Sequence, residues 1–223
     1  MDICVITNRR LRSDLAPEDL LARAARSGAD LLQIREKNLP DAELLRWTRI
    51  AVARGNERTP PVPVVVNGRP DVALAAGAAG VQLPADGLPV ADVVSRWRGS
   101  LRVGASVHSI EEAMKAQHDG ADWVMLGPVF DTPSKRSFGA PLGTSLLAAA
   151  CRTLTIPVYA IGGVNPDTAT QLRGIPLGGV AVISAVIGAL DMAAAVAALR
   201  EALAAPPERA LSGGVLGVEE VCR

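Results

Sequence analysis

Aromatic residues make up only 3% of this chain of 223 residues. Stacking surfaces for single-stranded nucleic acid therefore cannot be numerous, and the core must be built mainly from aliphatic side chains. The 23 Lys and Arg residues balance the 23 Asp and Glu residues, so no excess of positive charge spreads over the chain. We expect no nucleic-acid partner, because binding to a phosphate backbone needs such an excess. Any charge that matters must be local.

Cysteine is scarce as well. Cys4, Cys151 and Cys222 lie far apart, without the spacing of metal ligands. An odd number of distant cysteines fits a reducing compartment better than a secreted disulfide framework. We therefore expect a cytoplasmic protein without a structural zinc site.

Long hydrophobic segments are also missing. The first residues show no export signal, because the apolar run is short and the basic residues follow it. The segment from Gly174 to Leu190 is apolar apart from Ser184, but glycines and Pro176 interrupt it. Small residues contribute little to membrane transfer, so we expect a buried strand and a short turn here, and no membrane partner.

What the chain does contain is a regular alternation of short β-rich runs and helical patterns. The expected strands are Ile3–Thr7, Asp30–Glu36, Val62–Asn67, Gly80–Leu83, Arg102–Val107, Trp123–Phe130, Pro157–Gly162 and Gly179–Ser184. The expected helices are Pro17–Ser27, Asp41–Arg54, Asp71–Ala76, Val90–Trp97, Ser109–Asp119, Thr144–Thr153, Pro166–Arg173 and Met192–Leu203. Ser109 with Glu112 forms a capping-box pattern, and Asn165 before Pro166 suits a helix start.

Strict alternation predicts parallel strands joined by right-handed crossovers, and this number of units in this length predicts a closed (β/α)₈ TIM barrel. An open doubly wound sheet is the competing fold. Against it, Thr7-Asn8-Arg9-Arg10 follows the first strand where a dinucleotide-binding Gly-x-Gly-x-x-Gly would stand. We assign residues 1–204 to one barrel and residues 205–223 to a C-terminal tail.

A barrel places its chemistry at the carboxyl ends of its strands, and the second expected strand is polar there. Gln33, Arg35 and Lys37 recur with period two, while Leu32 and Ile34 occupy the alternate face. Unpaired cations are costly to bury, so this face should meet an anion at the barrel mouth, and phosphate fits best. The alternative is that Glu36 and another acid neutralise these cations as surface pairs.

Polar and glycine-rich segments also follow later strands. Asn67 ends the third strand, and the loop from 131 to 143 after the sixth strand holds Thr132, Ser134, Lys135 and Arg136. Hydroxyls and cations in such a loop are typical of a closing phosphate lid, although a solvated connection has the same composition. We thus predict a phosphate-binding loop after strand 6.

The seventh strand ends at Gly162 and Gly163, and the eighth ends at Ile183 and Ser184. These are the positions where barrels often hold phosphate with backbone N–H groups. We therefore predict phosphate-binding loops after strands 7 and 8 as well as after strand 6.

Two histidines and two acids complete the candidates. His108 shares the inward parity of Ser106 and could act as an acid or base at the mouth, or only tie its loop in place. His118 fits a solvated helix position. Asp71 and Asp86 are the plausible metal-binding pair at strand ends, and neither is securely aimed inward. We predict no metal ligands.

Five motifs in register resemble those of the thiamine phosphate synthase superfamily, from the second expected strand to the eighth. The motifs are Gln33-Ile-Arg35-Glu-Lys37, Gly104-Ala-Ser106, Gly127-Pro-Val-Phe-Asp-Thr132-Pro-Ser134-Lys135, Ala160-Ile-Gly162-Gly163 and Val182-Ile-Ser184. The resemblance covers residues 3–203 and implies a (β/α)₈ barrel. It also implies one of two activities: Mg²⁺-dependent joining of thiazole phosphate to a pyrimidine diphosphate, or TenI-like aromatisation of a thiazole carboxylate phosphate.

The resemblance assigns roles to residues by position. It implies that one group contacts the pyrimidine diphosphate, namely Arg35, Lys37, Asn67, Ser106 and Lys135, with Gln33 beside them. It implies that a second group, at the thiazole phosphate, consists of Thr132, Ser134, Gly163, Ile183 and Ser184, with Gly162 adjoining.

Departures from the synthase pattern favour the TenI-like branch. Gly68 stands where synthases have an Asp after the strand-end Asn, and Gly87 stands where the second Mg²⁺ ligand would fall. A departing diphosphate develops charge that Mg²⁺ neutralises, so losing both carboxylates should impair coupling. One departure points the other way. The resemblance implies a proton-shuttling histidine in the tautomerases, and Pro128 stands at that position here, as in the synthases.

The leading interpretation is therefore a thiazole tautomerase, an isomerase without a cofactor, in which His108, Gln82 and Lys37 act in catalysis. The second is a Mg²⁺-dependent thiamine phosphate synthase, a transferase, whose metal site Asp71 and Asp86 rebuild. The third is a regulator that binds thiazole or thiamine phosphate without turnover. All three share a small-molecule thiazole phosphate as ligand, and we expect a homo-oligomer.

Overall fold

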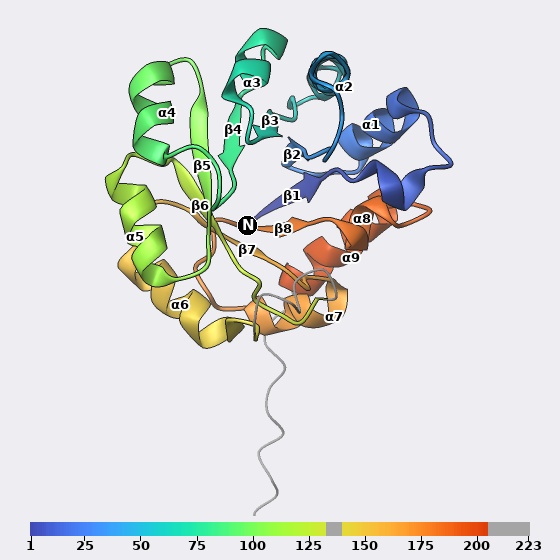
Figure 1. The fold of residues 1–223 in the computed structure, drawn as a ribbon. Coiled ribbons are helices and arrows are strands. Elements are labelled where there is room, and N and C mark those ends of the chain that lie inside the picture. Colours follow the sequence, from blue (N-terminus) through green and yellow to red (C-terminus); the bar gives the residue numbers. More distant parts are fainter. Residues whose placement is uncertain (133–139, 205–223) are drawn as a thin grey trace, which may run out of the picture.

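A computed structural model describes residues 1–132 and 140–204 of the chain. Eight parallel strands close into a barrel in sequence order, with β8 returning to pair with β1 (Figure 1). Their bounds are β1 Asp2–Ile6, β2 Leu31–Ile34, β3 Val64–Asn67, β4 Gly80–Leu83, β5 Arg102–Val107, β6 Trp123–Leu126, β7 Val158–Ile161 and β8 Gly179–Val182. The predicted (β/α)₈ barrel is confirmed.

Helices surround the strands as an outer ring (Figure 1). The α-helices are α1 Pro17–Arg26, α2 Asp41–Asn56, α3 Pro70–Ala76, α4 Val90–Trp97, α5 Ile110–His118, α6 Gly143–Thr153, α7 Pro166–Ala169, α8 Ser184–Ile187 and α9 Met192–Ala204. Two 3-10 turns, η1 Arg9–Arg12 and η3 Thr170–Leu172, complete the described elements. None of the helices in the described ranges is long and apolar enough to cross a membrane.

Two of the predicted helix starts are confirmed by their hydrogen bonds. The Ser109 hydroxyl accepts the backbone N–H of Glu112 at 3.1 Å at the start of α5. The Asn165 side chain accepts the N–H groups of Asp167 and Thr168 at the start of α7. Each cap satisfies donors that the first helical turn leaves free.

The alternation of each strand separates two apolar layers. Residues such as Leu32 and Ile34 point outward and pack against the helices. The inward layer is smaller and fills the barrel with side chains from several strands, namely Cys4, Ile6, Val65, Trp123, Met125, Tyr159 and Ala181. The layer also has a polar contact at the amino end of β1, where the Tyr159 hydroxyl donates to Asp2 at 2.8 Å.

Several boundaries differ from the sequence-based prediction. Strand β6 ends at Leu126 instead of Phe130, because Pro128 has no N–H for a ladder. The helix predicted for 166–173 is α7 followed by η3, and the short helix α8 was not predicted. Cys4 and Cys151 are free thiols. Cys222 and the predicted tail at 205–223 lie outside the described residues.

Candidate active site

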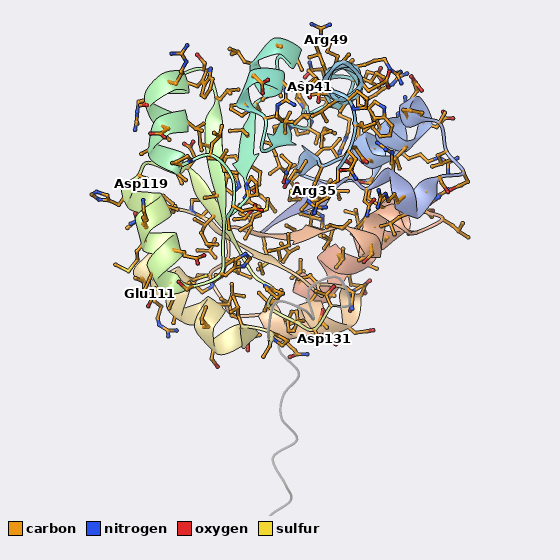
Figure 2. The ribbon with its side chains drawn as sticks, in the orientation of Figure 1. Arg35, Asp41, Arg49, Glu111, Asp119 and Asp131 are labelled. Atoms are coloured by element: carbon orange, nitrogen blue, oxygen red, sulfur yellow. The ribbon has the colours of Figure 1, made fainter. Side chains whose placement is uncertain are left out.

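The end of β2 carries the polar face that its sequence predicts. Gln33 is 2% exposed inside the barrel, and Arg35 is half-buried just beyond the end of the strand. Figure 2 shows Arg35 inside the ring, whereas Arg49 and Glu111 lie on the outer helices and Asp119 directly follows α5. Lys37 follows two residues later and is exposed. A cation is thus held over the barrel interior.

Neighbouring groups hold the backbone of this segment in place. The Thr7 hydroxyl accepts the N–H of Arg35 at 3.0 Å, and both carboxylate oxygens of Glu36 accept the N–H of Arg9 at 3.1 Å. Burial lowers the pKa of Arg35, and the charge of Glu36 opposes that shift only in part. Within residues 1–132 and 140–204 Arg35 forms no ion pair, so the idea that Glu36 neutralises it as a surface pair is not supported.

A cavity of about 80 Å³ opens between the ends of β1 and β2. Its lining consists of Asn8, Arg9, Arg10, Arg35, Glu36 and Lys37. One guanidinium nitrogen of Arg9, Nη1, is buried there without a hydrogen-bond partner among the described residues. Several cations facing one small space, one of them unsatisfied, are what an anion site requires.

Sequence reasoning missed Arg9. The segment Asn8-Arg9-Arg10 served only to exclude a dinucleotide fingerprint, although it directly follows the first strand. Its position at a barrel strand end was the available signal, because such ends converge on the mouth.

Side chains from five strands, β2 to β6, form two hydrogen-bonded groups inside the barrel. Gln33 Nε2 donates to Asn67 Oδ1 at 3.1 Å, and Gln33 Oε1 is buried without a partner in the described part of the chain. Gln82, which is 1% exposed, donates from Nε2 to the Ser106 hydroxyl at 3.0 Å. The Trp123 indole N–H donates to Gln82 Oε1 at 2.8 Å. The predicted residues of β2, β3, β4 and β5 therefore do meet in one interior.

His108 lies at the edge of this interior and is exposed. Its Nδ1 contacts the carbonyl oxygen of Gly127, and its backbone N–H donates to Glu112 at 2.7 Å. Because a carbonyl only accepts, Nδ1 must carry the proton, which leaves Nε2 as the free ring nitrogen. The ring ties two loops together, which is the second of the two roles proposed for it. His118 is exposed at the end of α5, as predicted.

The glycines after β7 pack tightly against the segment after β6. A Cβ on Gly162 would lie 2.6 Å from Pro128, and one on Gly163 would lie 2.6 Å from the Asp131 carbonyl. Phe130 N–H also donates to the Gly162 carbonyl at 3.0 Å. The ends of β6 and β7 are thereby held side by side, as a shared phosphate site needs.

The remaining residues predicted to contact phosphate differ in their exposure, and two of them lie outside the described residues. Ile183 is the N-terminal flanking residue of α8, Ser184 is its exposed first residue, and Thr132 is half-buried after β6. Ser134 and Lys135 lie outside the described residues.

The acids do not form a metal site. Asp71 accepts two hydrogen bonds from Arg69, and Asp86 is exposed. In the two described ranges no three His, Cys, Asp or Glu side chains cluster as metal ligands would. Since Mg²⁺ in enzymes of this kind is held by carboxylates together with substrate phosphates, the donor set does not fit the ion that the synthase pattern implies. Arg69 holds the carboxylate of Asp71, which argues against the hypothesis that Asp71 and Asp86 rebuild that site, and that hypothesis stays a prediction.

The chain is a (β/α)₈ barrel with a group of cations around a cavity at its mouth. The sequence model of the thiamine monophosphate synthase family matches residues 3–186, and this chain belongs to that family. It is 41% identical to a thiamine-phosphate synthase of Roseiflexus sp. over 95% of this chain and 89% of that protein. It is 36% identical to one of Chloroflexus aurantiacus over 93% of this chain and 94% of that protein.

Solved structures agree with this assignment. A thiamine phosphate pyrophosphorylase from Pyrococcus furiosus superposes with a TM-score of 0.81 at 35% identity, covering 91% of this chain and 95% of that one. A 3-hexulose-6-phosphate synthase superposes with a TM-score of 0.65 at 20% identity, covering 92% of this chain and all of that one, and shares the fold alone. The chain therefore belongs to a family of enzymes of thiamine biosynthesis.

Proposed function

We propose that this protein is a thiamine-phosphate synthase, a transferase that joins thiazole phosphate to a pyrimidine diphosphate. The single observation that carries the proposal is the group of Arg9, Arg35 and Lys37 around one cavity at the mouth, on a chain whose relatives are named for this reaction. The departures at Gly68 and Gly87 alone favour an isomerase, but the relatives' names favour the transferase.

The reaction needs charge stabilisation where the diphosphate leaves. As the pyrimidine methylene carbon loses the diphosphate and bonds to the thiazole nitrogen, negative charge builds on the departing oxygens. The guanidinium of Arg35, half-buried and unpaired within the described residues, is positioned to bind them. The buried Nη1 of Arg9 offers a further donor. The protein's cations thus supply stabilisation that does not depend on the missing carboxylates.

A second candidate function, thiazole tautomerase, keeps one specific observation in its favour. His108 presents Nε2 as a free nitrogen, because Nδ1 is bound to the Gly127 carbonyl. A free imidazole nitrogen can accept a proton and return it. Gln82 bonds to Trp123 and Ser106, and among the described residues it has no hydrogen bond to His108 through which it would orient the ring.

Product identification separates these functions. The purified protein is incubated with thiazole phosphate and pyrimidine diphosphate, with Mg²⁺ or with EDTA, and separately with the thiazole carboxylate phosphate tautomer. Formation of thiamine phosphate and diphosphate supports the proposal. Aromatised thiazole without coupling supports the tautomerase instead. Tight binding of thiazole phosphate without either product contradicts both and identifies a binding protein.

Two variants of one residue test the tautomerase directly. His108→Asn keeps a donor near the Nδ1 position and hence the tie to Gly127, whereas His108→Ala removes both nitrogens. If His108 shuttles the proton, both variants lose aromatisation. If it only holds the loop, His108→Asn stays close to the wild-type rate and the tautomerase mechanism through His108 fails.

A further inference from the structure

A gap in strand β5 lets side chains from its two neighbours meet inside the barrel. Gln82 on β4, Gly104 on β5 and Trp123 on β6 lie in register across the sheet. A Cβ on Gly104 would lie 2.1 Å from the Trp123 ring and 2.3 Å from Gln82 Oε1. Only glycine at the middle position allows the indole to cross β5 and reach Gln82.

The indole is held firmly at this position. Trp123 is 5% exposed, and the Arg102 guanidinium lies 5.6 Å from the centroid of its ring. Its N–H donates to Gln82 Oε1 at 2.8 Å. An indole N–H can only donate, so it selects the oxygen end of the Gln82 amide.

That choice determines what the other end of the amide does. With Oε1 on the indole, the NH₂ group of Gln82 faces Ser106 and donates to its hydroxyl oxygen at 3.0 Å. A hydroxyl has a single hydrogen and accepts through its lone pairs. Because Ser106 Oγ accepts from Gln82, its own hydrogen is left to donate elsewhere.

We propose that Trp123 is a positioning residue that acts through Gln82 to make the Ser106 hydroxyl a hydrogen-bond donor to the diphosphate. The three residues form a one-way relay, from the indole N–H through the amide to the hydroxyl. Ser106 lies two residues nearer the mouth than Gly104 on the same strand and is half-buried. That the anion is a diphosphate rests on the proposed function.

The second amide pair in the barrel provides a contrast. Gln33 donates to Asn67, but its Oε1 has no partner among the described residues, so no donor-only group selects its orientation. An amide free at one end can turn over, whereas the indole prevents Gln82 from doing so. The relay therefore fixes the direction of the hydrogen bond at Ser106, which a glutamine without a donor-only partner would not do.

A double-mutant cycle tests the relay with inorganic pyrophosphate as the probe, using calorimetry on the full chain. Trp123→Phe removes the N–H and keeps most of the aromatic volume, and Ser106→Ala removes the final donor. We expect each single variant to weaken pyrophosphate binding about two- to tenfold, the range of one net hydrogen bond. In the Ser106→Ala background, Trp123→Phe should change the affinity less than twofold. Steady-state kinetics should show the same coupling in KM for the pyrimidine diphosphate.

Additive losses, or no loss in Trp123→Phe, would overturn the relay, because a merely structural tryptophan does not depend on Ser106. Gln82→Met, a nearly isosteric change without a donor, repeats the cycle if Trp123→Phe fails to fold. Arg49→Gln, on the outer face of α2, serves as the matched control and should bind pyrophosphate as the wild type does. Coupling in pyrophosphate binding without thiamine phosphate formation would refute the proposed function and leave the relay standing.

Discussion

The guanidinium of Arg69 binds Asp71 through two parallel hydrogen bonds of 2.9 and 2.7 Å, on the first turn of α3. A third bond, from Nη1 of the same arginine, reaches Asp41 at the start of α2. Asp71 keeps 59% of its side chain exposed in this arrangement. The carboxylate nearest in sequence to Gly68 therefore belongs to a surface ion-pair group between α2 and α3.

This arrangement predicts that Asp71→Asn leaves the response to Mg²⁺ unchanged. If the protein couples its substrates, the ratio of the variant's rates with Mg²⁺ and with EDTA should match the wild-type ratio, since Arg69 already occupies the carboxylate of Asp71. The free energy of unfolding should fall by at most about 1 kcal/mol, because exposed ion pairs are worth little. Rates and urea unfolding measure the two effects. A selective loss of Mg²⁺ activation would show that Asp71 is a ligand after all.

Low pH should reduce the contribution of Arg69 to the free energy of unfolding. Its two hydrogen bonds to Asp71 lower the pKa of that carboxyl below the ordinary value, and its one hydrogen bond to Asp41 lowers the pKa of Asp41 likewise. A carboxyl with a lowered folded-state pKa stabilises the protein above its unfolded pKa of about 3.9, and this stability is lost as pH falls through the folded pKa. The stability difference between wild type and Arg69→Gln should thus be full at pH 6 and shrink below about pH 4.

Urea unfolding at several pH values measures this difference. Arg49→Gln, which removes an outer arginine of α2 that has no ion pair within the described residues, is the control. A difference between wild type and Arg69→Gln that stays constant down to about pH 2 would mean that packing, and not charge, carries the effect.

Removing the cation over the barrel should impair substrate binding strongly. Arg35→Ala is expected to lower kcat/KM about ten- to hundredfold, because one charge-assisted hydrogen bond to an anion is worth about 1.5–3 kcal/mol. The affinity for inorganic pyrophosphate should also depend less on salt, since one screened attraction is gone. Arg49→Ala, equal in charge change but on the outer helix α2, should leave both quantities unaltered. Equal effects of the two variants would remove Arg35 from the site.

Filling the gap in β5 should be costly. Gly104→Ala places a methyl group 2.1 Å from the Trp123 ring, so we expect a loss of about 3 kcal/mol in the free energy of unfolding. Gly77→Ala is the comparison: unlike Gly104, Gly77 has a positive φ of 70°, but no atom lies within 4 Å of its added Cβ, so this change should cost only about 1 kcal/mol. Chemical denaturation of both variants compares them. Similar losses would show that the crossing indole can move aside easily.

Much of the site was readable from single strands. The period-two pattern of Gln33, Arg35 and Lys37 predicted an inward polar face, and Leu32 and Ile34 do pack outward. What the pattern could not give is the partner of each side chain. Arg9 joins Arg35 only because β1 and β2 end side by side, and Arg69 reaches Asp41, 28 residues away, only because α2 packs beside α3.

The sequence by itself determined the barrel, its order of strands and the family, because strand and helix periodicities are local and five motifs recur in register. The tertiary structure alone decided which polar atoms meet. Gln82, Gly104 and Trp123 are 22 and 19 residues apart along the chain, yet the barrel register places them in one row. Hydrogen-bond direction depends on such long-range placement, so the donor role of Ser106 became visible only in the folded chain.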